Sequence, residues 1–143
     1  MTVSSRTQLG LQILCYLTLR YGGDPVQTSE LAAGTGTTEK YIGQIMLTIR
    51  ASPLVLSSRG AQGGYRLGKP AEDITVGDIL RTVEGSLAPV SCLDKESCPS
   101  EAECRTRFTW QKLYTEIQHC IDALRISDLV RAYHSMEETE GAL

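Results

Sequence analysis

The stretch LVLSSRGAQGGYRL, residues 54–67, limits the fold of this chain more than any other segment. Two short runs of strand-forming residues flank a centre that holds an arginine and three glycines. Because glycine adopts positive φ values at little steric cost, such a centre suits the tip of a tight hairpin. The pattern therefore predicts a β-hairpin, with residues 54–57 as its first strand and residues 65–67 as its second.

Two short helices are expected before this hairpin. The segment TSELAAGTG predicts a helix that is capped by Thr28 or Ser29 and ends in a glycine turn. Thr37 or Thr38 caps the next helix, whose apolar residues recur at spacings of three and four. Two helices followed at once by an arginine-bearing hairpin are typical of a winged helix-turn-helix domain. We expect residues 1–70 to form this domain, in a mainly α-helical chain with a small β-hairpin wing.

The second helix and the wing hold the candidate DNA contacts. The helix would enter the major groove, and the wing would reach the neighbouring backbone or minor groove. The candidates are Thr38, Lys40, Tyr41 and Gln44 on the helix, with Arg59 and Arg66 beside the wing tip. Gln44 can pair bidentately with adenine, and the arginines suit phosphate or narrow-groove contacts. The alternative is that Tyr41 packs in the core and Lys40 is only solvated.

The charge distribution agrees with a DNA-binding front half. Residues 1–69 carry seven Lys and Arg against three Asp and Glu, a net charge of +4. Residues 70–143 carry seven against fourteen, a net charge of −7. A basic front half on a chain of net charge −3 indicates a nucleic-acid surface confined to one region.

The chain shows neither a membrane span nor a secretion signal. No apolar run approaches the ~18 residues that a span requires. Polar residues interrupt the apolar positions near the N-terminus, and no small-residue cleavage site follows. We therefore expect a cytoplasmic protein with no membrane partner. In that reducing compartment the five cysteines are not expected to form a disulfide framework.

Three of the cysteines, Cys92, Cys98 and Cys104, recur at equal spacing in the polar segment CLDKESCPSEAEC. Thiolates select zinc, copper(I) or iron–sulfur centres. Structural zinc usually takes four ligands, with paired cysteines separated by two to four residues, which this spacing does not provide. A 2Fe–2S cluster also needs four protein ligands, whereas a 4Fe–4S cluster tolerates three thiolates and one weak ligand. The segment thus favours 4Fe–4S over 2Fe–2S.

Two metal-free alternatives remain open for this segment. The three thiols can form a redox switch through disulfides, or the segment can dock another protein. The other two cysteines, Cys15 and Cys120, lie among apolar helical residues and are expected to be buried. An enzyme is not expected, because the two histidines, His119 and His134, lie in predicted helices without a paired nucleophile.

The remainder of the chain predicts a dimer. We expect a linking helix in residues 71–91, the cysteine segment in residues 92–104, and a dimerisation helix followed by a last helix in residues 105–143. Apolar residues recur at alternating steps of three and four along the dimerisation helix. They are Trp110, Leu113, Ile117, Cys120 or Ile121, and Leu124. Such a seam finds little partner surface in a small wing domain, so it predicts a two-fold homodimer on a pseudo-palindromic DNA operator.

With these motifs, the chain resembles the iron–sulfur-sensing winged-helix transcriptional repressors, the family of the Isc-operon regulator and the nitric-oxide-sensing repressor. The matching stretches are YIGQ (41–44), LV (54–55), SSRGAQGGYRL (57–67), ITVGDILRTVEG (74–85) and the three cysteines. The resemblance implies a homodimeric regulator with a cluster held by Cys92, Cys98 and Cys104 near the dimer helix. It would respond to iron, oxygen, nitric oxide or redox state.

The resemblance does not supply the fourth cluster ligand. One branch of the family has a histidine three residues after the third cysteine, where this chain has Arg107, which cannot bind iron. Another branch uses a carboxylate near the start of the first helix of the opposite subunit. Gln8 occupies that position here, and a neutral amide is a poor iron ligand. Gln8 of the partner subunit is thus a weak candidate, and the fourth ligand stays open.

Overall fold

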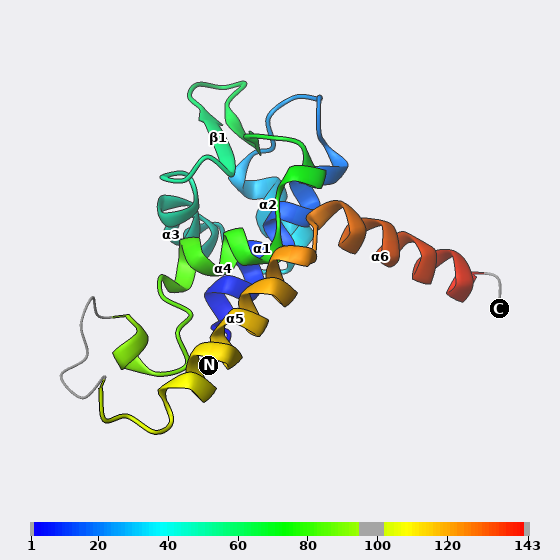
Figure 1. Cartoon of the computed structure of the whole chain (residues 1–143). Coiled ribbons are helices and arrows are strands. Elements are labelled where there is room, and N and C mark those ends of the chain that lie inside the picture. The colour runs from blue at the N-terminus through cyan, green and yellow to red at the C-terminus, as the bar shows by residue number, and fades with distance from the viewer. Residues whose placement is uncertain (1, 95–101, 142–143) are drawn as a thin grey trace.

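The computed structural model describes residues 2–94 and 102–141. Within these ranges the chain forms six α-helices, two short 3-10 helices and one two-stranded antiparallel sheet (Figure 1). The α-helices are α1 (Ser5–Leu19), α2 (Thr28–Thr35), α3 (Glu39–Ile49), α4 (Val76–Glu84), α5 (Arg107–Ala123) and α6 (Ile126–Gly141). The strands are β1 (Val55–Ser58) and β2 (Gly64–Leu67), and the 3-10 helices are η1 (Ala71–Asp73) and η2 (Ser91–Leu93). The expected mainly helical class with a small hairpin is confirmed.

Helix α1 occupies the centre of the main hydrophobic core. Its residues Ile13 and Leu14 are completely buried, and Leu17 is nearly so. Helices α2, α3, α4 and α6 and strand β2 all pack against it. Each fully buried leucine or isoleucine contributes about 1.5–3 kcal/mol relative to exposure. Burial of α1 therefore holds the surrounding elements in one body.

Polar side chains cap the starts of α1, α3 and α4. Thr38 caps α3, since its hydroxyl accepts a hydrogen bond from the Tyr41 amide at 3.2 Å. Thr75 and Asp78 form a reciprocal capping box at α4. The expectation that Thr28 or Ser29 caps α2 is wrong, because α2 begins at Thr28 and its N-cap is Gln27, whose side chain makes no capping bond.

The hairpin is attached to the helices through its second strand. Its register pairs Val55 with Leu67 and Ser58 with Gly64. Val26, just before α2, exchanges two backbone hydrogen bonds of 2.8 Å with Tyr65. Gly64 has φ +148°, and a Cβ there would lie 2.4 Å from the Val26 carbonyl oxygen. A glycine is thus required where this third segment passes the hairpin.

Helix α5 finds a partner within its own chain, contrary to the expectation of an isolated dimer seam. Ile121 is buried in a second cluster with Leu80 of α4 and Leu87, and Tyr114 and Ile117 pack against it. Next to this cluster, the Arg81 guanidinium donates two hydrogen bonds, of 2.7 and 2.8 Å, to the Asp122 carboxylate. The C-terminal half of α5 is therefore anchored on α4. The helix begins at Arg107, two residues later than expected.

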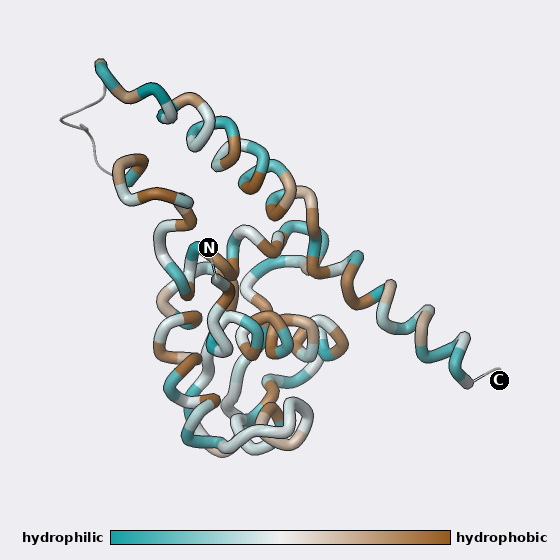
Figure 2. Tube along the Cα trace, turned by 90° about the horizontal axis from the view of Figure 1, so that it is seen from below, coloured by the Kyte–Doolittle hydropathy of each residue, from teal (hydrophilic) through white to brown (hydrophobic). Residues whose placement is uncertain are grey.

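The N-terminal half of α5 and most of α6 extend away from the body (Figures 1 and 2). Hydrophobic and hydrophilic residues alternate along both helices in Figure 2. Phe108 is 78% exposed, and Trp110 and Leu113 are also exposed. Of the predicted seam, Trp110, Leu113, Cys120 and Leu124 are thus left exposed by the same chain, and Phe108 adds an exposed aromatic side chain that the seam did not include.

None of the helices in the described part of the chain has the length and apolar character required to cross a membrane.

Substitution of Gly77 by alanine should weaken the contact between α4 and α5. A Cβ at Gly77 would lie 2.0 Å from Asp122 Oδ1 and 2.8 Å from Arg81 Nη1, so it would displace the ion pair. We expect Gly77→Ala to lower the free energy of unfolding by about 1–2 kcal/mol.

Gly43→Ala in α3 is the matched control, because a Cβ there meets nothing within 4 Å. It should stabilise the chain by up to about 1 kcal/mol through helix propensity. Urea unfolding followed by circular dichroism measures both effects. Equal shifts in the two variants would contradict the role assigned to Gly77.

Candidate nucleic-acid interface and cysteine segment

Helix α3 presents a continuous exposed face. Lys40, Gln44 and Leu47 are spaced by four and three residues and are all exposed, Leu47 to 59%. The buried face of the same helix carries Ile42, Ile45, Met46 and Ile49. The apolar spacing thus turns the two predicted contact residues Lys40 and Gln44 outward, and it adds Leu47 to the same face.

The other two predicted residues of this helix have structural partners. The Thr38 hydroxyl forms the helix cap described above, although the side chain is exposed. Tyr41 is half-buried and packs against the core, and its hydroxyl lies 3.4 Å from the Ser5 hydroxyl of α1. Tyr41 therefore lies at the edge of the α3 face, as the alternative of core packing anticipated.

The two predicted arginines of the wing are both exposed, but they lie in different places. Arg59 follows β1 at the wing tip and borders the space between the wing and α3. Arg66 pairs with Leu56 across the hairpin, and alternation along the strands turns this pair away from the Ser57–Tyr65 pair that borders the same space. Arg59 is thus the one of the two that faces α3.

A polar hollow of about 760 Å³ separates the wing from the helices. Arg50 at the end of α3 and Arg59 on the wing both line it, as do Gln27 and Thr28 at the start of α2. The Gln27 side-chain amide also donates a 3.1 Å hydrogen bond to the Ala61 carbonyl, which ties the wing tip to α2. Two guanidinium groups therefore border one concave surface.

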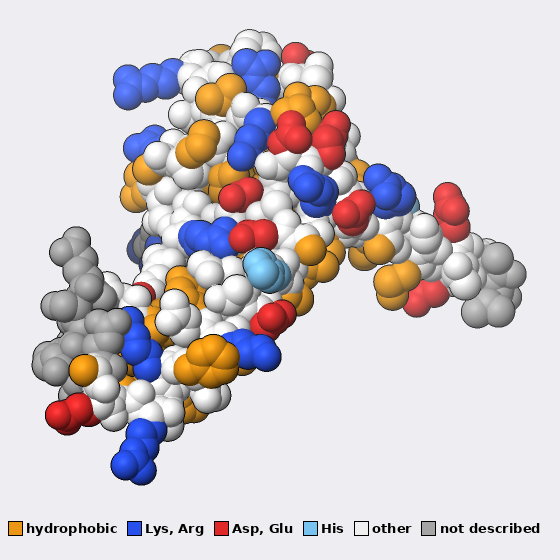
Figure 3. Space-filling view, viewed as in Figure 1, with side chains coloured by type: hydrophobic (Ala, Val, Ile, Leu, Met, Phe, Trp, Pro, Cys, Tyr) orange, Lys and Arg blue, Asp and Glu red, His pale blue; other side chains and the backbone are white. Residues whose placement is uncertain are grey.

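Sequence reasoning missed Arg50 and Leu47. Both continue the row of exposed residues that begins at Lys40 and Gln44, at steps of three or four. This helical spacing in the sequence could have identified both residues as members of the exposed face. In Figure 3, basic side chains occupy the wing and the neighbouring edge, whereas basic and acidic side chains are interspersed over the rest of the visible face.

The cysteine segment, residues 92–104, precedes α5 in the sequence and is well separated from the wing along the chain. Cys92 is half-buried in η2, and Cys104 is half-buried just before α5. Cys98, the third predicted ligand, lies outside the described residues. Cys92 and Cys104 are free thiols.

The environment of Cys104 favours its thiolate. Its Sγ lies 3.7 Å from the Thr106 hydroxyl. Hydrogen bonds from the Thr106 side chain and backbone, with a further contribution from Arg107, lower the pKa of the Cys104 thiol. The thiolate is the form that binds metals and attacks disulfides, so this residue suits either use of the segment.

The chemistry of the described donors fits an iron–sulfur centre but does not identify its fourth ligand. Cys92 and Cys104 can supply soft thiolate ligands. Arg107 is half-buried in the first turn of α5 and has no acceptor atom. Gln8 is exposed on α1, and its amide oxygen is the only donor that its side chain offers to a metal.

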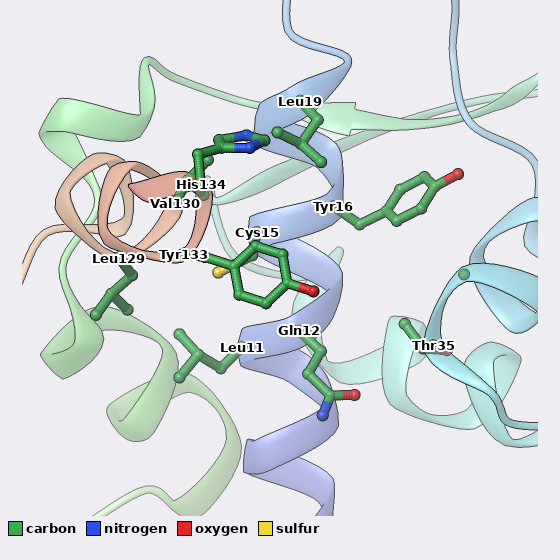
Figure 4. Close-up of a pocket in the computed structure, with 11 residues that line it drawn as sticks. Leu11, Gln12, Cys15, Tyr16, Leu19, Thr35, Leu129, Val130, Tyr133 and His134 are labelled. Carbon is green, nitrogen blue, oxygen red and sulfur yellow. The ribbon is translucent and has the colours of Figure 1, made fainter. Parts of the chain in front are cut away.

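Cys15 and Cys120 lie elsewhere. Cys15 borders an apolar cavity of about 630 Å³ between α1, α2 and α6 (Figure 4), and burial raises the pKa of its thiol. Tyr16 packs across the backbone of Gly34 beside this cavity. Cys15 is thus half-buried against the core, whereas the expectation that Cys120 is buried is wrong, since it is exposed on α5.

Comparison with known proteins gives consistent matches over nearly the whole chain. The family model Rrf2, described as an iron-dependent transcriptional regulator, matches residues 3–132. Protein rrf2 of Nitratidesulfovibrio vulgaris is 32% identical over 133 residues, which cover 92% of this chain and 88% of that protein.

Solved structures show the same architecture. CymR, the global cysteine regulator of B. subtilis, matches with a TM-score of 0.74 at 30% identity, covering 92% of this chain and 98% of CymR. T. potens IscR matches with a TM-score of 0.71 at 32% identity, covering 93% of this chain and 88% of IscR. These likenesses confirm the predicted winged-helix class.

Alkylation should distinguish the two thiols whose pKa values shift in opposite directions. In reduced, metal-free protein, the pH midpoint for iodoacetamide labelling should be lower for Cys104 than for Cys15, as measured by peptide mass spectrometry. Thr106→Val removes the hydroxyl that lowers the pKa of Cys104, so it should raise that midpoint. Equal midpoints for the two thiols would contradict the assigned environments.

Proposed function

The chain belongs to the Rrf2 family of transcriptional regulators, and we propose that it binds a pseudo-palindromic DNA operator as a homodimer whose affinity is set by Cys92, Cys98 and Cys104. Its relatives are DNA-binding regulators and not enzymes. Contact with chromosomal DNA would place the protein in the cytoplasm. Iron, oxygen, nitric oxide and redox state are the signals to which such thiols respond.

The proposed DNA surface consists of the exposed face of α3 and the wing. The observation that carries it is the hollow between these two elements, which Arg50 of α3 and Arg59 of the wing both line. With α3 in the major groove, Lys40 and Gln44 would meet base edges or phosphates, and Leu47 would meet thymine methyl groups. Arg50 and Arg59 would hold the backbone, while Arg66, Thr38 and Tyr41 would lie at its margin.

The proposed dimer interface is the part of α5 that the chain leaves uncovered. Phe108, Trp110 and Leu113 are exposed on one helix, and aromatic side chains of this kind are enriched in the centres of interfaces. A two-fold axis along α5 would place two α3 helices on successive half-sites of a palindrome.

We favour a 4Fe–4S cluster as the group bound by Cys92, Cys98 and Cys104, with 2Fe–2S as the alternative. The family description as iron-dependent, the likeness to IscR and the lowered pKa of Cys104 support an iron–sulfur cluster, and the set of three thiolates favours the 4Fe–4S form. When bound, the cluster supplies a redox-active centre that oxygen, nitric oxide or iron loss can alter. The fourth ligand would be a weak or external group, with Gln8 of the partner subunit as a candidate.

The second candidate function is a metal-free thiol switch. The 33% identity with CymR over 129 residues favours it, since CymR of B. subtilis is described as the global cysteine regulator. In this case a peroxide would oxidise another thiol of the segment to a sulfenic acid, and the Cys104 thiolate would attack that sulfur, forming a disulfide and releasing hydroxide.

Arg59→Ala should weaken operator binding and reduce its salt dependence. Loss of one phosphate contact reduces the slope of log K against log salt by about 0.9 per site. Fluorescence anisotropy at several salt concentrations measures this slope.

Arg131→Ala is the matched control for that measurement, because Arg131 is an exposed arginine on α6 far from the wing. It should leave both affinity and slope unchanged. An unchanged slope for Arg59→Ala would remove Arg59 from the contact set.

Anaerobic purification tests the two uses of the cysteines. The favoured function predicts a coloured protein with about four iron and four sulfide per chain, and the alternative cluster about two of each. Alanine substitution of Cys92, Cys98 and Cys104 together should abolish this content. Colourless protein that lacks iron and sulfide, with DNA affinity that depends on oxidant, would instead support the thiol switch.

A further inference from the structure

The last residue of α4, Glu84, joins the cysteine side of the molecule to the start of α1. Its Oε1 accepts hydrogen bonds from the Ser4 amide at 2.9 Å, the Ser4 hydroxyl at 2.5 Å and the Thr7 hydroxyl at 2.5 Å. Ser4 is the N-cap of α1, and its hydroxyl also accepts from the Thr7 amide. One carboxylate thus organises the whole N-terminal turn of α1, where the helix dipole favours a negative charge.

The same turn of α1 contacts the recognition helix α3 at two points. The Arg6 guanidinium donates a 3.2 Å hydrogen bond to the Thr48 hydroxyl. The Ser5 hydroxyl lies 3.4 Å from that of Tyr41, near the other end of α3. Because Ser5 and Arg6 lie between Ser4 and Thr7, the turn that Glu84 holds also contacts α3 near both of its ends.

On its other side, Glu84 adjoins the segment that leads to Cys92. Gly85 follows with φ +78°, and Ser86 hydrogen-bonds the Asp94 side chain, so residues 86–94 fold back beside the end of α4. Val3 and Glu84 line a small cavity of about 120 Å³ together with Ser86, Leu87 and Ala88. The N-terminal residues and the start of the segment that carries Cys92 therefore line one cavity.

We propose that Glu84 is a positioning residue for DNA binding, which holds the first turn of α1 and thereby links the segment that carries Cys92 to the orientation of α3. This inference rests on the proposed DNA-binding function. A displacement of residues 85–94 would act on the Glu84 carboxylate, then on Ser4 and Thr7, and then on α3 through Ser5 and Arg6. This path is continuous. Each step is either a hydrogen bond or the covalent link between residues that are neighbours in the sequence.

The test uses the full chain and a DNA fragment selected from random sequence by the wild-type protein. Glu84→Gln keeps the size of the side chain and removes its charge. It should change DNA affinity by ~2- to 30-fold and speed amide hydrogen exchange in the first turn of α1. It should also bring the affinities of cysteine-intact and cysteine-alkylated protein closer together.

Glu30→Gln is the matched control. Glu30 makes a comparable link at the other end of α1, where it accepts a 3.0 Å hydrogen bond from the Tyr16 hydroxyl. If such carboxylates had only a structural role, both variants would show the same change in DNA affinity and in its difference between intact and alkylated protein. The positioning role predicts that only Glu84→Gln reduces the difference between intact and alkylated protein.

A double-mutant cycle with Thr48→Val tests the path to α3 without reference to the state of the cysteines. Non-additive effects of Glu84→Gln and Thr48→Val on DNA affinity support the link, and additive effects overturn it. If Glu84→Gln fails to fold, Thr7→Val replaces it in the cycle. Wild-type protein that selects no DNA would refute the proposed function itself, whereas wild-type binding with an unaltered Glu84→Gln variant would refute only this inference.

Discussion

The burial of α1 is the constraint on which the rest of the structure depends. Ile13, Leu14 and Leu17 lose nearly all contact with water, and they do so against elements from both ends of the chain. Because the core is close-packed, α2 and α3 cannot move relative to α4 and α6 without opening space around this helix. The proposed DNA-binding elements therefore share one core with α4, the helix on which α5 packs through the second cluster.

This common core gives the proposed DNA surface its rigidity. Val26 pairs with Tyr65, and Gln27 reaches the Ala61 carbonyl, so the wing is bound to the start of α2. The exposed face of α3 and the wing consequently keep a defined hollow between them. Arg50 and Arg59 approach this hollow from two separate elements, an arrangement that suits the backbone of a nucleic acid and follows from packing rather than from local sequence.

The cysteine segment is attached to the rest of the molecule through the second hydrophobic cluster and through α5. Leu87 packs with Ile121 and Leu80, so the chain is held in place shortly before Cys92. At the other end of the segment, Cys104 lies just before the start of α5. The family includes proteins described as iron-dependent and as cysteine regulators. The proposed route from the cysteine segment to α3 through Glu84 would serve either a cluster or a thiol switch in this chain.

The sequence by itself determined the local features of this protein. The hairpin, the Thr38 cap, the capping box at Thr75 and the outward direction of Lys40 and Gln44 depend on hydrogen bonds and periodicity within a few residues. Only the tertiary structure decided that α5 packs on α4, that Cys120 is exposed, that Arg50 and Arg59 line one hollow, and that Glu84 meets Ser4. These contacts join residues far apart in the chain, up to eighty positions for Glu84, and no local pattern specifies which distant side chain a group will meet once the core closes.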